Sequence, residues 1–328
     1  MQLSFAPMEG ITTSVYRRIH AELFPGADRY YAPFLAPDST GQVKLSALRD
    51  LLPEQNGGLV PVPQILCSRA EPFLILAREL AAMGYGEADL NMGCPSGTVV
   101  PKHKGAGMLL DLQDLDRTLS EIFARCPLRV SVKTRLGLES PAEFSKICEI
   151  LGRYPLSLLI VHARDRRGMY RSVPDLGAVR RALPQIRAPL CYNGNVFDLP
   201  SFEHVREALP GLAGMMLGRG AVADPALFRI LRGGAPPEAG ELRDFLDRLC
   251  ASYRETGMQE HHVLGRMKEI WYYVNYMFPG AGRELKQLMK ARDLTDYQAA
   301  VAGMFRSGRF DPAGRFPGEM PALDGRET

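Results

Sequence analysis

The chain has 328 residues, of which 46% are hydrophobic and 23% are charged, and its formal net charge is +3. These values are typical of a soluble globular protein with a sizeable core. No apolar run approaches the roughly 18 residues that a membrane-spanning helix needs. The first residues, MQLSFAPMEG, lack the features of a secretory signal. The small net charge neither requires nor excludes a nucleic-acid partner, because the distribution of charge decides that question.

The cysteines are scattered along the chain, without a CxxC pair and without metal-ligand spacing. They are Cys67, Cys94, Cys126, Cys148, Cys191 and Cys250. We expect most of them to be small buried hydrophobic residues in a reducing cytoplasm. The sequence therefore predicts a cytoplasmic protein and no metal site.

Short apolar runs alternate with amphipathic helical patterns from residue 3 to about residue 232. The predicted strands cover residues 3–8, 29–34, 62–67, 87–92, 129–134, 156–163, 188–193 and 212–218. Eight strands, each followed by a helix, predict a (β/α)₈ barrel. A doubly wound open sheet is the competing α/β interpretation, but APMEG follows the first strand where that fold often has GxGxxG.

Two of the predicted helices have recognisable starts. Asp114 is the predicted first residue of one, and Ser140 with Pro141 supplies an N-cap and first helical position for another.

The pattern changes after the last predicted strand. GGAPPEAG at 233–240 is typical of a linker, and residues 241–306 show only helical patterns. We expect a barrel over residues 1–235, a small helical domain over 241–306 and a loosely ordered tail over 307–328. Trp271 is expected to pack between the helices of the small domain.

Polar and reactive residues follow the apolar bodies of the predicted strands. In a (β/α)₈ barrel the active site lies at these carboxyl ends. NGN at 193–195 and GRG at 218–220 follow the last two strands, where such barrels commonly bind phosphate. Arg219 can bind phosphate oxygens in a bidentate manner.

Three of these residues allow more than one interpretation. Lys133 lies in an apolar strand and could form a Schiff base, face an electron-rich cofactor or extend to the surface. His162 could contact a ligand or be an ordinary half-buried histidine. Cys94 lies between Gly93 and Pro95 on a stiff loop, where a mainly protonated thiol could donate a proton or act as a nucleophile.

Several motifs occur in the same order and spacing as in a known family. They are APMEG, QILC, ADLNMGCPS, GAGMLL, VKTRLG, VHARDRRGMY, YNGN and MMLGRGAVADP. The chain thereby resembles the tRNA-dihydrouridine synthases over nearly the whole barrel. The resemblance implies an FMN enzyme that uses NADPH to reduce the C5–C6 double bond of selected uridines in the tRNA D-loop.

The resemblance also implies roles for individual residues. Pro7, Met8 and Glu9 would line the flavin, Gln64 would hydrogen-bond its isoalloxazine ring, and Lys133 and His162 would lie near it. Asn193, Gly194, Asn195, Gly218 and Arg219 would hold the phosphate. Hydride would pass from flavin N5 to C6 of the uracil, and Cys94 would donate the proton to C5.

The expected partner is therefore tRNA, whose target base must leave its folded context to reach the barrel. The residues expected to contact tRNA are Asn91, Lys102, Lys104, Arg135, Arg164, Arg166, Arg167, Tyr170, Arg266 and Lys268. Tyr170 could stack on a base, and the charged residues could contact phosphates. Each charge could equally belong to ordinary solvated surface.

The chain departs from the family pattern at 30–37, where Ala32 and Pro33 stand at a place that is often acidic. PMEG resembles the branch acting on uridine 16. Other interpretations are a flavin barrel that reduces a free pyrimidine or enone, a Lys133 Schiff-base aldolase and a non-catalytic RNA-binding barrel. We expect a monomer.

Overall fold

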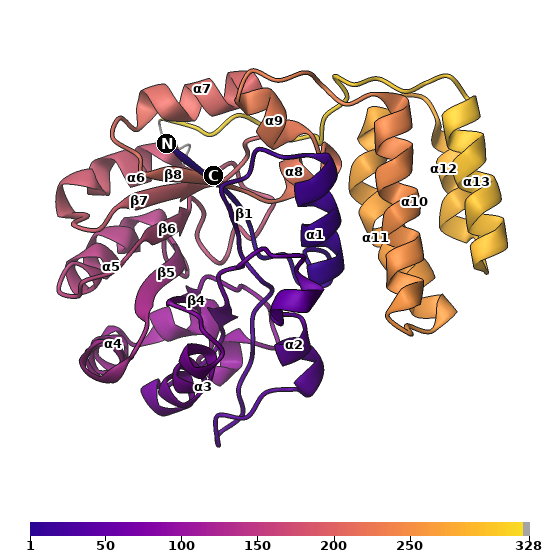
Figure 1. Ribbon diagram of the computed structural model, residues 1–328. Helices are drawn as coiled ribbons and strands as arrows, with labels where there is room; N and C mark the ends of the chain where they lie inside the picture. Colours follow the sequence, from indigo (N-terminus) through magenta and orange to yellow (C-terminus); the bar gives the residue numbers. More distant parts are fainter. Residues whose placement is uncertain (324–328) are drawn as a thin grey trace.

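The computed structural model describes residues 1–323. Its sheet has eight strands in the order β2-β1-β8-β7-β6-β5-β4-β3, all paired in parallel. The strands are β1 (Gln2–Phe5), β2 (Arg29–Tyr30), β3 (Gln64–Ile65), β4 (Glu87–Met92), β5 (Arg129–Arg135), β6 (Leu159–His162), β7 (Leu190–Asn193) and β8 (Gly214–Leu217). Parallel bridges Tyr31–Val62 and Leu35–Ile65 connect the segments of β2 and β3. The predicted (β/α)₈ barrel is confirmed (Figure 1).

Helices surround this sheet. They are α1 (Ser14–Leu23), α2 (Leu45–Arg49), α3 (Ala70–Ala82), α4 (Leu112–Arg125), α5 (Phe144–Leu151), α6 (Leu176–Ala182), α7 (Leu199–Ala208), α8 (Arg219–Ala223) and α9 (Leu227–Leu231). Short 3₁₀ turns are η1 (Pro53–Gln55), η2 (Val100–Lys102), η3 (Gly105–Leu110), η4 (Pro141–Glu143), η5 (Leu183–Gln185) and η6 (Asn275–Met277). No helix within residues 1–323 is long and apolar enough to cross a membrane.

Two strands are shorter than the sequence predicts. The expected strands at 29–34 and 62–67 are reduced to β2 and β3, each of two residues. Pro33 and Pro63 lie within the predicted runs and lack the N–H that a regular ladder requires. Only isolated bridges continue the pairing there.

Two helix starts show how capping sets the boundaries. Asp111 accepts hydrogen bonds from the backbone N–H groups of Gln113 and Asp114, so α4 begins at Leu112 and not at Asp114 as predicted. Ser140 forms the predicted cap, in a capping box with Glu143, although η4 intervenes before α5 begins.

The inner face of the barrel is partly apolar and partly polar. A small apolar cluster, which includes Leu158, Ile160 and Cys191, is separate from the main core beneath the helices. Side chains alternate between the two faces of a strand, so the residues of β5 and β6 that share this inner face include Lys133 and His162. The barrel interior therefore supplies polar groups to its carboxyl end.

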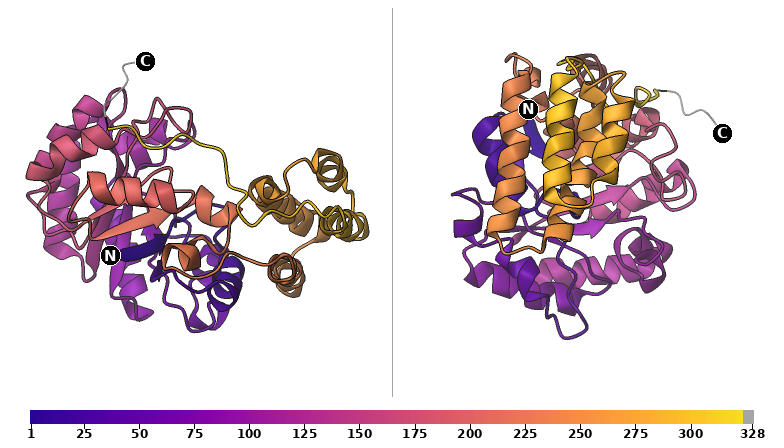
Figure 2. Two further views of the ribbon diagram at one scale, coloured as in Figure 1. Left: turned by 90° about the horizontal axis from the view of Figure 1, so that it is seen from above. Right: turned by 90° about the vertical axis from the view of Figure 1, so that its right-hand side faces the viewer.

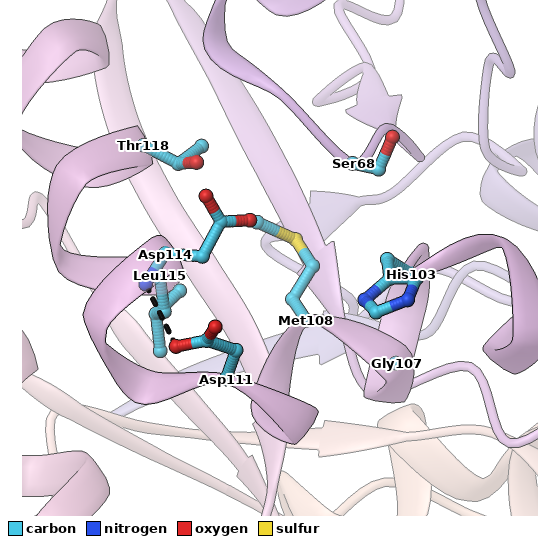
Figure 3. A pocket seen from close by; sticks show the side chains of 8 residues that line it. All are labelled: Ser68, His103, Gly107, Met108, Asp111, Asp114, Leu115 and Thr118. Atoms are coloured by element: carbon cyan, nitrogen blue, oxygen red, sulfur yellow. Dashed lines mark hydrogen bonds between the residues drawn. The ribbon is translucent and has the colours of Figure 1, made fainter.

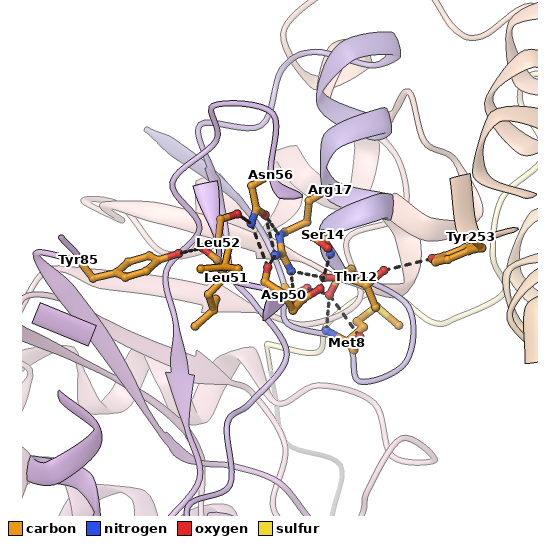
Figure 4. Close-up of polar contacts among 12 residues, drawn as sticks. Met8, Thr12, Ser14, Arg17, Asp50, Leu51, Leu52, Asn56, Tyr85 and Tyr253 are labelled. Carbon is orange, nitrogen blue, oxygen red and sulfur yellow. Dashed lines mark hydrogen bonds and ion pairs between the residues drawn. The ribbon is translucent and has the colours of Figure 1, made fainter. Parts of the chain in front are cut away.

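The loop after β1 is fixed by a buried arginine (Figure 4). Arg17 donates to Asp50 Oδ2 at 3.0 Å, to Asn56 Oδ1 and to the carbonyl oxygen of Thr12. The hydroxyl oxygen of Thr12 in turn accepts a hydrogen bond from the N–H of Met8 at 2.8 Å. Because Arg17 is fully buried and paired with a carboxylate, its contacts hold this loop against the barrel.

Four helices follow the barrel as a separate layer beside α1 (Figure 2). They are α10 (Ala239–Glu255), α11 (Glu260–Val274), α12 (Gly282–Lys290) and α13 (Leu294–Arg306). Trp271 of α11 is fully buried and donates from Nε1 to the hydroxyl oxygen of Tyr297 at 3.0 Å. The prediction that Trp271 packs between helices is confirmed.

The chain after α13 returns to the barrel (Figure 2, left). Phe316 is buried beside Phe197, Ala322 forms a parallel bridge with Asp175, and the carbonyl oxygen of Glu319 accepts from Asn195 Nδ2 at 2.9 Å. The expectation of a loosely ordered tail is wrong for residues 307–323, because these side-chain and backbone contacts replace regular secondary structure. The rest of the expected tail, 324–328, lies outside the described residues.

Candidate active site

A cavity opens at the carboxyl ends of the strands. All the residues predicted to bind the cofactor line it except Glu9 and Gln64. They are Pro7, Met8, Lys133, His162, Asn193, Gly194, Asn195, Gly218 and Arg219. Residues from the ends of four strands and from the loop after β1 thus meet at one place, as the barrel topology requires.

The cavity wall is strongly cationic. Lys133, Arg164 and Arg219 line it, and no carboxylate does. Within the described part of the chain, none of these three cations has an ion-pair partner. Burial lowers the pKa of Lys133 to about 8, and the neighbouring Arg135 contributes in the same direction. Cations without an ion-pair partner in a partly closed cavity favour an anionic ligand.

Asn195 connects two of the cations. Its Oδ1 accepts from Arg164 Nη2 and from Arg219 Nη2, both at 2.9 Å. The guanidinium of Arg219 also lies over the ring of Phe316, 5.3 Å from its centroid. The amide and the ring hold the guanidinium in place before any ligand binds.

The imidazole of His162 has a defined protonation state. Burial lowers its pKa well below the ordinary value, and the nearby charge of Arg135 adds to this effect. Arg164 Nη1 lies 3.0 Å from His162 Nε2, and because a guanidinium can only donate, Nε2 must accept. The neutral ring therefore carries its proton on Nδ1.

The cavity fits a ligand with a phosphate at one end. Close backbone packing shapes it, since a Cβ on Gly194 would lie 2.4 Å from the hydroxyl oxygen of Tyr192. Apolar atoms of Ala6, Pro7 and Met8 form another part of the wall, which suits a flat ring system. This donor set is compatible with FMN, for which Arg164 and Arg219 would hold the phosphate.

The thiol of Cys94 lies on the loop after β4. Its N–H and that of Gly93 both donate to Asn91 Oδ1, at 2.9 and 3.0 Å. Cys94 is half-buried, and burial raises the pKa of its thiol, with a further contribution from the charge of Glu9. The thiol is therefore protonated at neutral pH and suited to donate a proton.

Gly105 explains how the following segment packs on this loop. It has a φ of +57°, and a Cβ there would lie 2.8 Å from the Cβ of Cys94. The other cysteines are buried, apart from the half-buried Cys126 after α4.

Gln64 and Glu9 lie outside the cavity lining. Glu9 is exposed, whereas Gln64 is buried and donates from Nε2 to Asp89 Oδ2 at 2.7 Å. The Oε1 of Gln64 accepts from Asn91 Nδ2, also at 2.7 Å. Asp89 was not predicted, although its position two residues before Asn91 in a buried strand indicated that both share the inner face.

Several residues expected to contact tRNA instead form hydrogen bonds within the protein. Arg135 is only 1% exposed and donates to the carbonyl oxygens of Gly93, Asp165 and Met169. It therefore connects the loop that carries Cys94 with the loop after β6.

Other basic residues also contact backbone carbonyls. Arg164 is 2% exposed and belongs to the cavity wall. Lys104 donates to Pro37, Arg266 to Gly10 and Lys268 to Ala291.

A smaller group faces solvent. Lys102 and Arg167 are exposed, and Arg166 is half-buried. Tyr170 is 53% exposed, lines the cavity, and lies with its ring centroid 4.9 Å from the guanidinium of Arg219. The loop after β6 thus places an aromatic ring at the cavity mouth.

A second, smaller hollow lies beside the segment that follows the Cys94 loop (Figure 3). His103, Met108, Asp111 and Asp114 are among its lining residues, and none of the predicted site residues is. Across residues 1–323 there is no cluster of His, Cys, Asp and Glu suited to hold a metal ion.

The fold and the cavity define a (β/α)₈-barrel protein with a cationic cavity at the carboxyl ends of its strands. Its sequence matches the dihydrouridine synthase (Dus) family over residues 4–301. The chain belongs to this family.

Two curated relatives illustrate the match. The chain is 29% identical over 200 residues to a probable tRNA-dihydrouridine synthase of Rhodobacter capsulatus, covering 60% of each sequence. It is 30% identical over 204 residues to the tRNA-dihydrouridine(16) synthase of Ralstonia nicotianae, covering 60% of this chain and 62% of that protein. The matches thus span about 60% of the length of these relatives.

Solved structures share the barrel. A 2-naphthoyl-CoA reductase complex superposes with a TM-score of 0.52 at 12% identity, covering 71% of this chain and 50% of that one. A variant of morphinone reductase in complex with tetrahydroNAD gives 0.52 at 11% identity, covering 72% and 88%. At such low identity the likeness concerns the fold.

Proposed function

We propose that this protein is an FMN-dependent tRNA-dihydrouridine synthase, which reduces the C5–C6 double bond of specific D-loop uridines with NADPH. One observation carries the proposal: a protonated thiol, Cys94, lies at the same barrel end as a cavity whose cations lack carboxylate partners. Family membership supports this assignment and disfavours the Lys133 aldolase. We infer that the enzyme acts as a monomer in the cytoplasm.

The residues of the chain divide the work. The chemistry that FMN would supply when bound and reduced by NADPH is a hydride for C6 of the uracil. Cys94 donates its proton to C5, so that one hydride and one proton together add two hydrogens to the base. Lys133 lines the cavity and would contribute positive charge toward a reduced, negatively charged flavin.

Other residues bind and orient. Arg219 and Asn195 would hold the phosphate with Asn193, Gly194 and Gly218, while Pro7 and Met8 would pack against the ring. Glu9 and Gln64 would act from just outside the cavity lining. His162, fixed by Arg164, would offer its Nδ1–H as a donor.

The tRNA would approach over the exposed residues. Lys102, Arg166 and Arg167 are proposed to contact phosphates, and Tyr170 to stack on an extruded base. The buried Arg135 and the internally bonded Lys104, Arg266 and Lys268 would support this surface from within.

The purified protein tests the cofactor directly. We expect flavin absorption bands near about 450 nm, which arise from the isoalloxazine ring. Incubation of unmodified tRNA with the protein and NADPH should then add two hydrogens to each target uridine, measured by mass spectrometry of nuclease fragments.

Two variants sharpen the test. Cys94→Ala should abolish the mass gain while retaining the flavin bands, whereas Cys126→Ala, between α4 and the amino end of β5, should leave both unchanged. A flavin-loaded protein that modifies no tRNA but reduces free uracil or an enone would instead establish the alternative barrel reductase.

A further inference from the structure

We propose that Asp89 is a positioning residue that sets the orientation of the Cys94 loop through Gln64 and Asn91. The inference deepens the proposed function, because it concerns the placement of the proton donor. It assigns a role to a buried carboxylate that contacts neither the cavity nor the thiol.

A continuous chain of hydrogen bonds connects Asp89 with the loop. Gln64 Nε2 donates to Asp89 Oδ2 at 2.7 Å, and Asn91 Nδ2 donates to Gln64 Oε1 at 2.7 Å. Asn91 Oδ1 then accepts the N–H groups of Gly93 and Cys94. The other carboxylate oxygen, Asp89 Oδ1, accepts from Ser131 Oγ at 2.7 Å.

The chemistry at the two ends fixes the direction of this chain. An ionised carboxylate can only accept, and a backbone N–H can only donate. Between them, each amide must present its NH₂ toward Asp89 and its oxygen toward the loop. A reversed amide would bring two donors or two acceptors together at either end.

Burial makes the direction obligatory. Asp89 is fully buried, Gln64 is 1% exposed and Asn91 is 7% exposed, so water cannot readily replace a lost partner. If Asp89 no longer accepts, the Gln64 amide can reverse and turn its NH₂ toward Asn91. The Gln64 NH₂ would then face Asn91 Nδ2, so the Asn91 amide would also reverse to avoid two facing donors. Its Oδ1 would leave the N–H groups of Gly93 and Cys94, and the loop would lose these two hydrogen bonds.

Amide hydrogen exchange reads these bonds directly, without any cofactor or substrate. In an Asp89→Leu variant, which keeps the branched shape but removes the acceptor, we expect exchange of the Gly93 and Cys94 amides to accelerate at least tenfold. The amide of Val132, which bonds Leu158 in the neighbouring strands, should keep its protection. Gln64→Met should give the same selective change, which provides a second variant if Asp89→Leu does not fold.

Two further variants control for ordinary loss of core contacts. Ser131→Ala removes a bond to the same carboxylate but leaves the chain intact, so exchange at Gly93 and Cys94 should change less than twofold. The double variant Asp89→Asn/Gln64→Glu moves the carboxylate, which can only accept, from position 89 to position 64. The amide at position 89 then donates to the carboxylate at position 64, which still accepts from Asn91. The exchange rates of the Gly93 and Cys94 amides should therefore return to within about threefold of the wild type.

The outcomes are distinct. Selective loss of exchange protection at Gly93 and Cys94, with recovery in the double variant, supports the proposed chain of hydrogen bonds, even if no tRNA is reduced. Uniform acceleration across the barrel, or unchanged exchange in both Asp89→Leu and Gln64→Met, overturns it. If the proposed function holds, Asp89→Leu should also lower kcat for tRNA reduction about tenfold with KM unchanged.

Discussion

Arg164 donates a hydrogen bond from Nη1 to Nε2 of His162, and this contact decides which imidazole nitrogen carries the proton. The guanidinium cannot accept, so protonation of Nε2 would place two donors together. Burial and the surrounding cations act in the same direction on the histidine. The ring is therefore neutral throughout the physiological range.

This neutrality predicts acid sensitivity. The unfolded chain binds a proton at His162 as pH falls below its ordinary pKa of 6.5, whereas the native chain does not. The contribution of this residue to stability is thus complete above that value and decreases as pH falls below it. His162→Gln keeps an acceptor for Arg164 but cannot titrate. Urea unfolding at pH 7.5 and 5.5 should show that this variant loses less free energy of unfolding between the two pH values than the wild type does.

His20 provides the comparison, since burial lowers its pKa to about 3 and it lies far from the cavity, against Tyr30 and Pro225. Its acid sensitivity should persist in the His162→Gln variant. An imidazole signal of His162 that titrates near 6.5 by NMR would contradict the assigned state.

Lys133 predicts a pH dependence of flavin binding. Its pKa is lowered to about 8, so its charge is present below that pH and is lost as pH rises through it. FMN affinity should therefore weaken between about pH 7 and 9. Fluorescence titration of the apoprotein with FMN measures this.

Variants of Lys133 test the cause. Lys133→Arg keeps a charge that does not titrate in this range, and its affinity should be flat with pH. Lys133→Met should bind FMN weakly, and its affinity should also be independent of pH. A pH dependence that persists in Lys133→Met would assign the titration to another group.

The returning tail predicts a role for Phe316 in the cofactor site. Phe316 is buried, packs against Phe197 and lies beneath the guanidinium of Arg219. Phe316→Ala should lower the free energy of unfolding by about 3 kcal/mol and weaken FMN binding. Phe316→Tyr, which keeps the ring, should retain most of the affinity. Wild-type affinity in Phe316→Ala would show that Arg219 needs no support from the tail.

The exposed basic residues predict a salt-dependent contact with tRNA. Arg167→Ala and Lys102→Ala should each weaken tRNA binding and reduce the slope of log K against log salt by roughly 0.7–0.9. FMN affinity should not change, because neither residue lines the cavity. Arg125→Ala, an exposed arginine at the last residue of α4, serves as the control. Equal effects from all three substitutions would indicate general electrostatic attraction without a defined contact.

The sequence predicted the residues that local patterns define. Cys94 could be placed at a strand end because Gly93 and Pro95 flank it in the sequence. The cavity residues could be predicted because a barrel brings the carboxyl ends of its strands together. The partners of Arg135 and Lys268 could not be predicted, because they are backbone carbonyls supplied by distant segments. An exposed and a buried arginine look the same in a single sequence.

The tail was misjudged for a related reason. Glycine and proline argue against helices and strands, but they do not prevent a chain from packing through one ring and a few carbonyl oxygens. The apolar residues of this segment are irregularly spaced, and the partners of Phe316 lie in the loop after β7 and in α11. No periodic pattern marks such contacts.

The location of Phe316 and Glu319 has a consequence for biosynthesis. The cationic cavity wall joins Met8, in the loop after β1, to a ring and a carbonyl some three hundred residues further along the chain. A nascent chain can form the barrel early, yet Arg219 and Asn195 gain their last neighbours only after residue 319 has left the ribosome. A chain that stopped before Phe316 would therefore keep the barrel strands but would lack the ring beneath Arg219 and the carbonyl oxygen that accepts from Asn195.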